Sequence, residues 1–395
     1  MANKYWVGGG ASTNWNATGN TNWSLTSGGA NNAAIPTSAD TVIFDGVGVN
    51  ANGTSTISAA ITVISINQTG FSGTLVSNQT LTITGTPVTL SATATYSGTT
   101  GTLILSGAGT TNLVSNGKTW TAPMTISNGG TKNLIDNWTV NGLVSIGTGT
   151  NTLNGNTLVM KNGITNLNGH VQGTTLLDLQ GGAWSTATTH IIFNNMNLNG
   201  NIAIANSGAG NVTYNTGTLT HVSGTINVVG TLITGGATFN VEQVIWNTVT
   251  VNASSTMTLL SPLRGRTLNM GNVNVVFAGA GRFDFDILNY TANTAAQMTL
   301  QADVDYQIWE TLNISQSRIG TPVAVISSSP TVKAKFFLHP NATCNCNANF
   351  TRIDASIEAV GYGVYSRSIN TWNGVVTDCI NINSFTEYRR TALTF

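Results

Sequence analysis

Four aspartates in the last third of the chain are the side chains best suited to do chemistry. In Arg282-Phe-Asp-Phe-Asp-Ile, Asp284 and Asp286 alternate with large apolar residues, which places both carboxylates on one face of a β-strand. Asp303 and Asp305 repeat the pattern nineteen residues later, in Gln-Ala-Asp-Val-Asp-Tyr. If one coil of a repeating β-structure takes about nineteen residues, we expect Asp284 to stack near Asp303 and Asp286 near Asp305.

Such a patch of four carboxylates has three interpretations. Paired carboxylates could act as acid and as nucleophile or base in glycoside cleavage, because neighbouring like charges raise the pKa of one of them. The same oxygens could bind Ca²⁺. Alternatively the aspartates are solvated or paired with Arg282, since a one-residue slip in register turns a side chain to the other face. We favour this third interpretation and assign no catalytic residue and no metal site.

Other residue types offer weaker signals. Trp184, Trp246 and Trp309 could stack on sugar rings if they face outward, although core or capping roles are more common for tryptophan. The three cysteines, Cys344, Cys346 and Cys379, form neither a disulfide framework nor the paired spacing of a zinc site. The glycine-rich runs lack the strand, loop and helix context of a phosphate loop. The sequence therefore predicts no cofactor.

Scarcity of charge is the main compositional feature. The 395 residues include 14 basic and 14 acidic side chains, and only Asp40 and Asp45 are charged between Lys4 and Lys118. Helical domains need charged residues on their outer faces, whereas the Thr, Val, Ile, Asn and Gly that dominate here favour strands and tight turns. The zero net charge argues against nucleic-acid binding, and no apolar run is long enough to insert into a membrane as a helix.

Short apolar segments recur between turn signals from about residue 46 to 300. Asn-Gly pairs such as Asn116-Gly117 suit turns with positive φ. Four apolar segments begin roughly 16 to 19 residues apart, at Trp138, Thr157, Thr175 and Ile191. Strands this short, with about one coil per repeat, favour a parallel β-helix over a sandwich of longer antiparallel strands. Outward Thr and Asn would then form ladders, where repeated like charges would repel.

The two ends of the chain differ from this repeat region. Residues 1–45 place Trp6, Trp15, Trp23 and Phe44 among Gly and Asn, which predicts an aromatic cap that closes the exposed end of a solenoid. Residues 301–395 belong to a C-terminal stretch that is richer in charge, and we expect a β domain or a broadened end of the solenoid there. The predicted fold is thus an all-β parallel β-helix (β-solenoid) with an aromatic N-terminal cap and a C-terminal β region.

The N-terminal segment resembles a known group of proteins. Tyr5-Trp-Val-Gly-Gly-Gly, Asn14-Trp, Thr21-Asn-Trp-Ser, Ile35-Pro-Thr-Ser-Ala-Asp and Val42-Ile-Phe-Asp are similar to the opening of β-solenoid proteins encoded by tailed phages, and to autotransporter-like adhesins. The resemblance is specific over residues 1–45 and compositional beyond them. It implies a bacteriophage virion surface protein of the tail fibre, spike or head decoration type, and it supplies no catalytic residue.

The resemblance also implies partners and a location. We expect contacts with other virion proteins, a homotrimer if the protein is a fibre, and a host surface glycan as the candidate ligand. Two alternatives remain open, a tailspike-type polysaccharide depolymerase that uses the four aspartates and a bacterial surface adhesin. The opening Met-Ala-Asn-Lys-Tyr-Trp has no apolar stretch of the signal-peptide type, which favours a virion protein made in the host cytoplasm over an exported adhesin.

Overall fold

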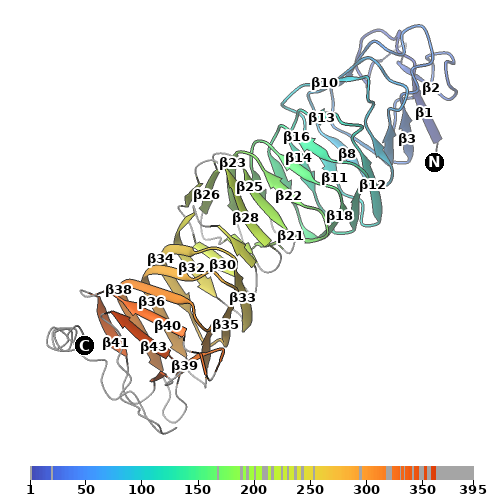
Figure 1. Ribbon diagram of the computed structural model, residues 1–395. Coiled ribbons are helices and arrows are strands. Elements are labelled where there is room, and N and C mark those ends of the chain that lie inside the picture. Colours follow the sequence, from blue (N-terminus) through green and yellow to red (C-terminus); the bar gives the residue numbers. More distant parts are fainter. Residues whose placement is uncertain are drawn as a thin grey trace, which may run out of the picture. The chain divides into compact units, whose positions relative to one another are not determined.

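The protein is all-β. The computed structural model describes residues 2–18, 21–166, 169–186, 190–192, 195–199, 202–206, 212–214, 218–223, 226–228, 231–234, 238–241, 244–251, 254–292, 296–316, 323–329, 331–332, 334–339, 342–346, 351–353 and 357–361. These residues contain strands and turns and no helix. Nearly all of their strands pair in parallel with the strand one coil away, which is the architecture of a parallel β-solenoid (Figure 1). The predicted fold class is confirmed.

The chain divides into two compact units. The first comprises residues 1–210 and 222–225, and the second comprises residues 211–221 and 226–395. The sequence placed a boundary near residue 300 and left open whether the part beyond it is a β domain or a broadened end of the solenoid.

In the first unit the strands form four sheets, here called A to D. Sheet A contains β1 (Ala2–Trp6), β2 (Trp23–Ser24), β3 (Asp40–Ile43), β6 (Ser65–Asn67), β9 (Val88–Thr89), β12 (Thr110–Val114), β15 (Thr131–Leu134), β18 (Gly149–Gly155), β21 (Gly169–Gly173) and β24 (His190–Ile192). Sheet B contains β4 (Thr54–Ile57), β7 (Thr74–Ser77) and β10 (Thr95–Ser97). Sheet C contains β5 (Ile61–Val63), β8 (Leu81–Ile83), β11 (Leu103–Leu105), β14 (Met124–Ile126), β17 (Val144–Ile146), β20 (Ile164–Asn166), β23 (Gly182–Thr186) and β26 (Ile202–Asn206). Sheet D contains β13 (Thr119–Trp120), β16 (Trp138–Val140), β19 (Leu158–Met160), β22 (Leu177–Leu179) and β25 (Met196–Asn199).

Very short strands suffice here because each coil adds one layer to a continuous core. In sheet D, Trp138 lies beside Leu158, Leu158 beside Leu177, and Leu177 beside Met196. All four side chains are buried, and the intervals between them along the chain are nearly equal. Three of the apolar segments recognised in the sequence therefore stack as successive coils of sheet D, and the fourth begins in sheet A, with Ile191 beside His170, and joins the stack at Met196. Asn116 and Gly117 both have positive φ, 50° and 73°, as expected for a tight Asn-Gly turn.

The aromatic residues of the N-terminal segment form one buried cluster. The Phe44 ring is the common contact of Trp6, Trp15 and Trp23, with centroid separations of 5.7, 5.8 and 6.0 Å, and it lies 4.9 Å from the Phe71 ring. All five side chains are at most 1% exposed. The cluster is consistent with the predicted cap at the N-terminal end of the solenoid.

A lysine side chain lies inside the first unit. Lys132 points inward from β15 and is fully buried. Its Nζ donates to the carbonyl oxygens of Gly107, at 2.7 Å, and Gly129, at 2.9 Å. Burial lowers the pKa of Lys132. The buried Asn151 has a similar role on the next strand of sheet A, where its Nδ2 donates to Gly149 O at 3.2 Å, so long polar side chains satisfy carbonyls that turn into the core.

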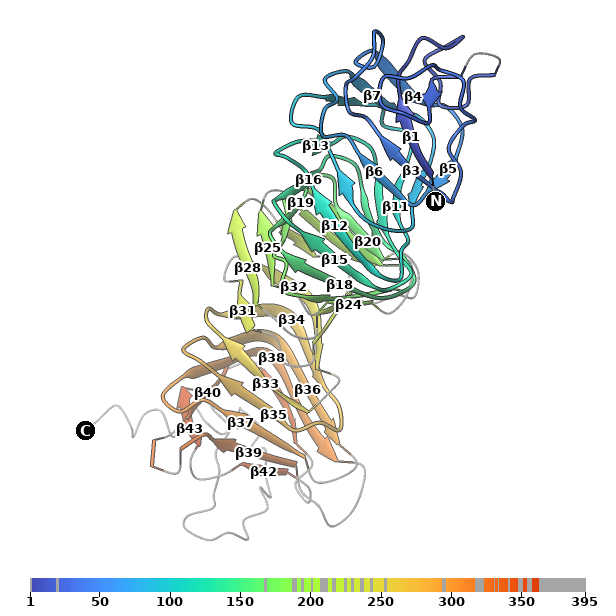
Figure 2. The same cartoon turned by 90° about the vertical axis from the view of Figure 1, so that its right-hand side faces the viewer.

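The second unit is built from the same kind of coil, with longer strands (Figure 2). Its strands of sheet A are β27 (Val212–Tyr214), β30 (Thr231–Thr234), β32 (Ile245–Val251), β34 (Leu263–Met270), β36 (Phe283–Ala292), β38 (Asp305–Gln316), β40 (Ala334–Leu338), β41 (Thr343–Cys346) and β43 (Ile357–Gly361). Its strands of sheet D are β28 (Thr218–Ser223, of which residues 218–221 belong to this unit), β31 (Thr238–Asn240), β33 (Ser255–Leu259), β35 (Val275–Ala278), β37 (Gln297–Leu300), β39 (Val323–Ser327) and β42 (Thr351–Ile353), and β29 (Ile226–Val228) belongs to sheet C.

Strands on both sides of residue 300 pair directly. β36 pairs in parallel with β38, and β38 pairs with β40 and β41. The described strands beyond residue 300 are therefore further coils of the solenoid. Cys344 and Cys346 lie in β41, whereas Cys379 lies outside the described residues.

An asparagine ladder runs through these coils. Asn289 donates to Asn269 at 2.8 Å, Asn313 donates to Asn289 at 2.6 Å, and Asn345 donates to Asn313 at 2.8 Å. The side-chain amides of Asn289 and Asn313 thus each donate a hydrogen bond to the preceding coil and accept one from the following coil. The polar ladder expected from the composition is present in the second unit.

Candidate functional site

The structure does not stack the four aspartates as expected. Asp284 lies beside Gln307 on β38, not beside Asp303. Asp303 lies in a turn with a φ of 59°, and Asp305 begins β38, where it lies beside Lys335. The coil that separates Asp284 from Gln307 is longer than the repeat assumed from the sequence, because it runs past Asp303 before it returns to sheet A. The prediction that Asp284 stacks near Asp303 and Asp286 near Asp305 is therefore wrong.

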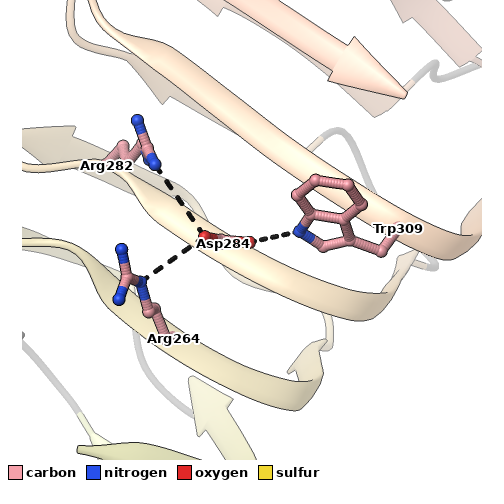
Figure 3. Close-up of polar contacts among 4 residues, drawn as sticks. All are labelled: Arg264, Arg282, Asp284 and Trp309. Atoms are coloured by element: carbon pink, nitrogen blue, oxygen red, sulfur yellow. Dashed lines mark hydrogen bonds and ion pairs between the residues drawn. The ribbon is translucent and has the colours of Figure 1, made fainter. Parts of the chain in front are cut away.

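Asp284 instead lies at the centre of a polar cluster on the outward face of sheet A (Figure 3). Its Oδ2 is 3.5 Å from Nε of Arg264, on β34, and 4.0 Å from Nη2 of Arg282, just before β36. Its Oδ1 accepts a hydrogen bond from the indole Nε1 of Trp309, on β38. Pairing with Arg282 was one of the sequence interpretations. Arg264 and Trp309 were not foreseen as partners, because only the stacking of three coils brings them together.

Strand alternation turns Trp309 outward next to the buried Ile308, and a β-bulge places Glu310 on the same face. Phe285 lies beside Ile308 and Ile287 beside Thr311, with an irregularity between these pairs. Asp286 therefore faces two residues, Trp309 and Glu310, and both of these are exposed. A bulge of this kind bends the strand and redirects side chains, and bulges are common beside binding and active sites.

The bulge also brings two carboxylates near each other. The pKa of Asp286 is raised, first because part of the side chain is buried and then because of the negative charge of Glu310; the cation of Arg266 opposes this, and Asp284 adds to it. Among the described residues, no group of three His, Cys, Asp or Glu side chains is arranged to hold a metal ion.

The three tryptophans singled out as potential sugar-stacking residues have different environments. Trp184 and Trp246 are fully buried, whereas Trp309 is 39% exposed. The Trp309 ring centroid lies 5.4 Å from the His339 ring and 6.1 Å from the Phe337 ring, both tilted relative to it. Trp309 is therefore supported by neighbouring rings and is partly open to solvent.

A shallow, open groove of about 340 Å³ adjoins this cluster. Its lining comprises Leu260, Ser261, Pro262, Ala280, Gly281, Arg282, Asp303, Val304 and Asp305. Arg282 belongs both to the groove and to the Asp284 cluster. We call the combined surface, from the groove to Trp309, the Trp309 surface.

Comparison with protein-family models, curated proteins and solved structures found no match to this chain. Among the described residues, no helix has the length and hydropathy needed to cross a bilayer. A functional assignment must therefore be argued from the geometry and the N-terminal resemblance.

Proposed function

We propose that this chain is a structural protein of the outer surface of a bacteriophage particle, of the tail fibre, spike or decoration type, and that it contacts the host surface through a glycan. The observation that carries the proposal is the aromatic cluster around Phe44. The residues that gave the N-terminal segment its resemblance to phage solenoid proteins are the residues that pack together there. We infer that the residues of this resemblance have a physical role, which is to cover the first coil.

The arrangement of the solenoid supports a structural role. Successive coils are hydrogen-bonded to each other along sheets A, C and D, and side-chain ladders such as the asparagine ladder add bonds in the same direction. A stack of this kind presents surface side chains at fixed positions on rigid strands. Such rigidity suits a protein that displays a recognition surface.

The experiment that tests the proposal is location. We expect the chain to co-purify with phage particles through a density gradient, and antibody labelling in electron micrographs to mark one site on the tail or the head. Its mass in solution, measured by light scattering, is expected to be that of a homotrimer if it is a fibre. Absence from purified particles would overturn the proposal, and recovery from the bacterial envelope would favour the adhesin alternative.

A glycan-cleaving enzyme is the second candidate, and one observation favours it. Asp286 has a raised pKa and lies opposite Glu310 across the bulge, and a carboxyl that holds its proton can serve as the general acid in glycoside hydrolysis. If the protein cleaves host capsular polysaccharide, Asp286→Asn and Glu310→Gln should each abolish the release of reducing ends. Asp45→Asn, in the N-terminal segment, is the matched control. Absence of cleavage by the wild-type protein removes this candidate.

A further inference from the structure

We propose that the Trp309 surface binds an uncharged pyranose unit of a glycan, with the Trp309 indole as the stacking platform and Arg282 as a hydrogen-bond donor at the entrance of the groove. This inference deepens the proposed function and rests on it only for the biological source of the sugar. The binding step itself is a property of the isolated protein.

The first argument is the fixed orientation of the indole. An exposed tryptophan normally has rotamer freedom that binding must remove, and removal of that freedom opposes affinity. Here the Nε1–H of Trp309 is bonded to Asp284, and Asp284 is itself held between Arg264 and Arg282. The ring is thus oriented before any ligand arrives. A flat, partly exposed aromatic ring is suited to the apolar face of a sugar ring.

The second argument is the supply of polar groups around the platform. A guanidinium carries five N–H donors in a planar fork, whereas the ion pair of Arg282 with Asp284 uses one nitrogen. Arg282 also lines the groove, together with Asp303 and Asp305. A sugar has many hydroxyls that both donate and accept hydrogen bonds, so an arrangement of one donor fork and two carboxylates matches its chemistry.

The third argument is the distance between platform and groove. Asp305 and Trp309 are four residues apart on β38, which corresponds to about 13 Å along an extended strand. The ligand therefore needs to be longer than one ring to touch both. This favours an oligosaccharide or polysaccharide chain over a free monosaccharide.

The fourth argument is the charge balance. Three cations of the surface are matched by three carboxylates, namely Arg264, Arg266 and Arg282 by Asp284, Asp286 and Glu310. The groove adds Asp303 and Asp305. Because the described side chains of the surface carry no surplus of positive charge, they offer no electrostatic attraction to a sugar acid. Around the indole itself, where the sugar ring would stack, the three arginines balance the three carboxylates. This balance favours an uncharged sugar there over a cationic amino sugar.

The test measures binding of defined saccharides to the full-length protein by isothermal titration calorimetry. The probes are neutral hexose oligosaccharides, matched oligosaccharides of uronic acids and of amino sugars, and polysaccharide purified from the host surface. We expect binding to at least one neutral probe. Binding confined to the uronic-acid or the amino-sugar probes would overturn the assignment to uncharged sugars, and no binding to any probe would overturn the site.

Three variants make the test specific. Trp309→Ala should weaken binding about tenfold or more, as expected for an aromatic anchor. Trp309→Phe keeps a flat ring but loses the hydrogen bond to Asp284, so it should retain part of the affinity, and it also covers the case in which the alanine variant does not fold. Ile135→Ala removes a 56% exposed apolar side chain in the first unit and should leave binding unchanged.

Equal affinity of the wild type and Trp309→Ala, with both folded by circular dichroism, would show that the sugar binds elsewhere and would overturn the inference. The result is independent of particle labelling. If the protein binds the neutral probe through Trp309 but is absent from virions, the site stands and the proposed virion role is wrong. If the protein is present in virions but binds no saccharide, the virion role stands and the site is wrong.

Discussion

The two units of the solenoid differ in where charged side chains lie on their strands. In sheet D of the first unit the coils repeat at nearly constant intervals, and outward positions hold mostly neutral side chains. In the second unit the coil from Asp284 to Gln307 is longer than the preceding coil, from Arg264 to Asp284. The lengthening coincides with a bulge, an exposed tryptophan and a cluster of charges. In sheet D of the first unit, regular stacking therefore pairs neighbouring strands with mostly neutral side chains on the outward face, whereas in the second unit the irregular coil is where charged side chains and an exposed tryptophan reach the surface.

Aromatic residues show the same contrast. The rings of the N-terminal cluster are buried against one another, while Trp309 lies over the surface of sheet A and contacts charged and polar neighbours. In the first unit the aromatic rings contribute to folding through burial. In the second unit part of the Trp309 ring remains available to a ligand.

Removal of a ring in each unit should give the largest difference between them. Phe44→Ala leaves a cavity at the centre of the aromatic cluster and should lower the free energy of unfolding of the first unit by about 3–5 kcal/mol. Trp309→Ala, as the matched variant in the second unit, should lower stability by only about 1 kcal/mol because the ring is partly exposed. Hydrogen exchange read by mass spectrometry measures each unit separately. Similar losses for both variants would contradict the contrast between the two aromatic sites.

The buried Lys132 should give the next largest effect. Lys132→Met leaves the carbonyls of Gly107 and Gly129 without their donor, and we expect a loss of about 2 kcal/mol at pH 7. Hydrogen exchange in a urea series, followed at peptides of the first unit, measures it. Lys161→Met, at an exposed position of the same unit, should change stability by less than about 0.5 kcal/mol.

The pH dependence of this variant provides a second check. Because burial lowers the pKa of Lys132, the unfolded chain binds more protons than the folded chain between that lowered pKa and the unfolded value of about 10.4. Wild-type stability should therefore rise with pH in this window, because deprotonation favours the state that binds fewer protons. The neutral amine can still donate to both carbonyls. The difference between the wild type and Lys132→Met should widen as the pH approaches about 10. A constant difference would mean that Lys132 has the same pKa in both states.

The asparagine ladder of the second unit should give a smaller effect. Asn289→Ala removes the hydrogen bond that Asn289 donates to Asn269 and the one that it accepts from Asn313. This loss should lower the free energy of unfolding by about 1 kcal/mol. Asn133→Ala in the first unit breaks one bond of 3.2 Å, to the exposed Asn112, and should lower it by less. Differential scanning calorimetry of the two variants compares them directly. A larger loss for Asn133→Ala would show that the continuous ladder adds nothing beyond its single bonds.

Much of the first unit could be predicted from the sequence because its pattern is local. The apolar segments around Trp138, Leu158 and Leu177 recur at nearly one interval, so their stacking follows from the spacing. The aromatic cluster follows from composition, since large rings between Gly and Asn near the end of a solenoid need a place to pack. The inward position of Lys132 was not foreseen, because its role depends on carbonyls of two neighbouring turns.

The candidate site could not be predicted in the same way. The longer coil moved Asp303 into a turn and placed Gln307 beside Asp284, and nothing in the local pattern marks such an insertion. The bulge at Trp309 and Glu310 likewise depends on the partner strand. The sequence did name Asp284 and Asp286 as candidates, because they alternate with large apolar residues, and Trp309, because an outward indole can stack on a sugar ring.

The smallest expected effect is also the most discriminating. Replacement of an aspartate by asparagine should raise the folding stability of the second unit at Asp286 and lower that of the first unit at Asp136. The raised pKa of Asp286 means that its carboxylate is disfavoured in the folded state. Folded-state stability is therefore lost as the pH rises from about 3.9, the unfolded value, through the raised pKa. Asp286→Asn should stabilise the second unit at pH 7, by less than about 0.5 kcal/mol because solvent screens the site, and the gain should disappear below about pH 4.

Asp136→Asn in the first unit should do the opposite. The two oxygens of Asp136 accept the backbone N–H groups of Ser115, at 2.7 Å, and Asn116, at 2.6 Å. An amide nitrogen cannot accept a hydrogen bond, so one backbone donor loses its partner and stability at pH 7 should fall by about 1 kcal/mol. Thermal unfolding of both variants at pH 4 and pH 7 measures the two signs. If both substitutions lower the stability at pH 7, the Asp286 carboxylate stabilises the fold as the Asp136 carboxylate does. The idea that the bulge holds a charged group at a cost in stability would then be wrong.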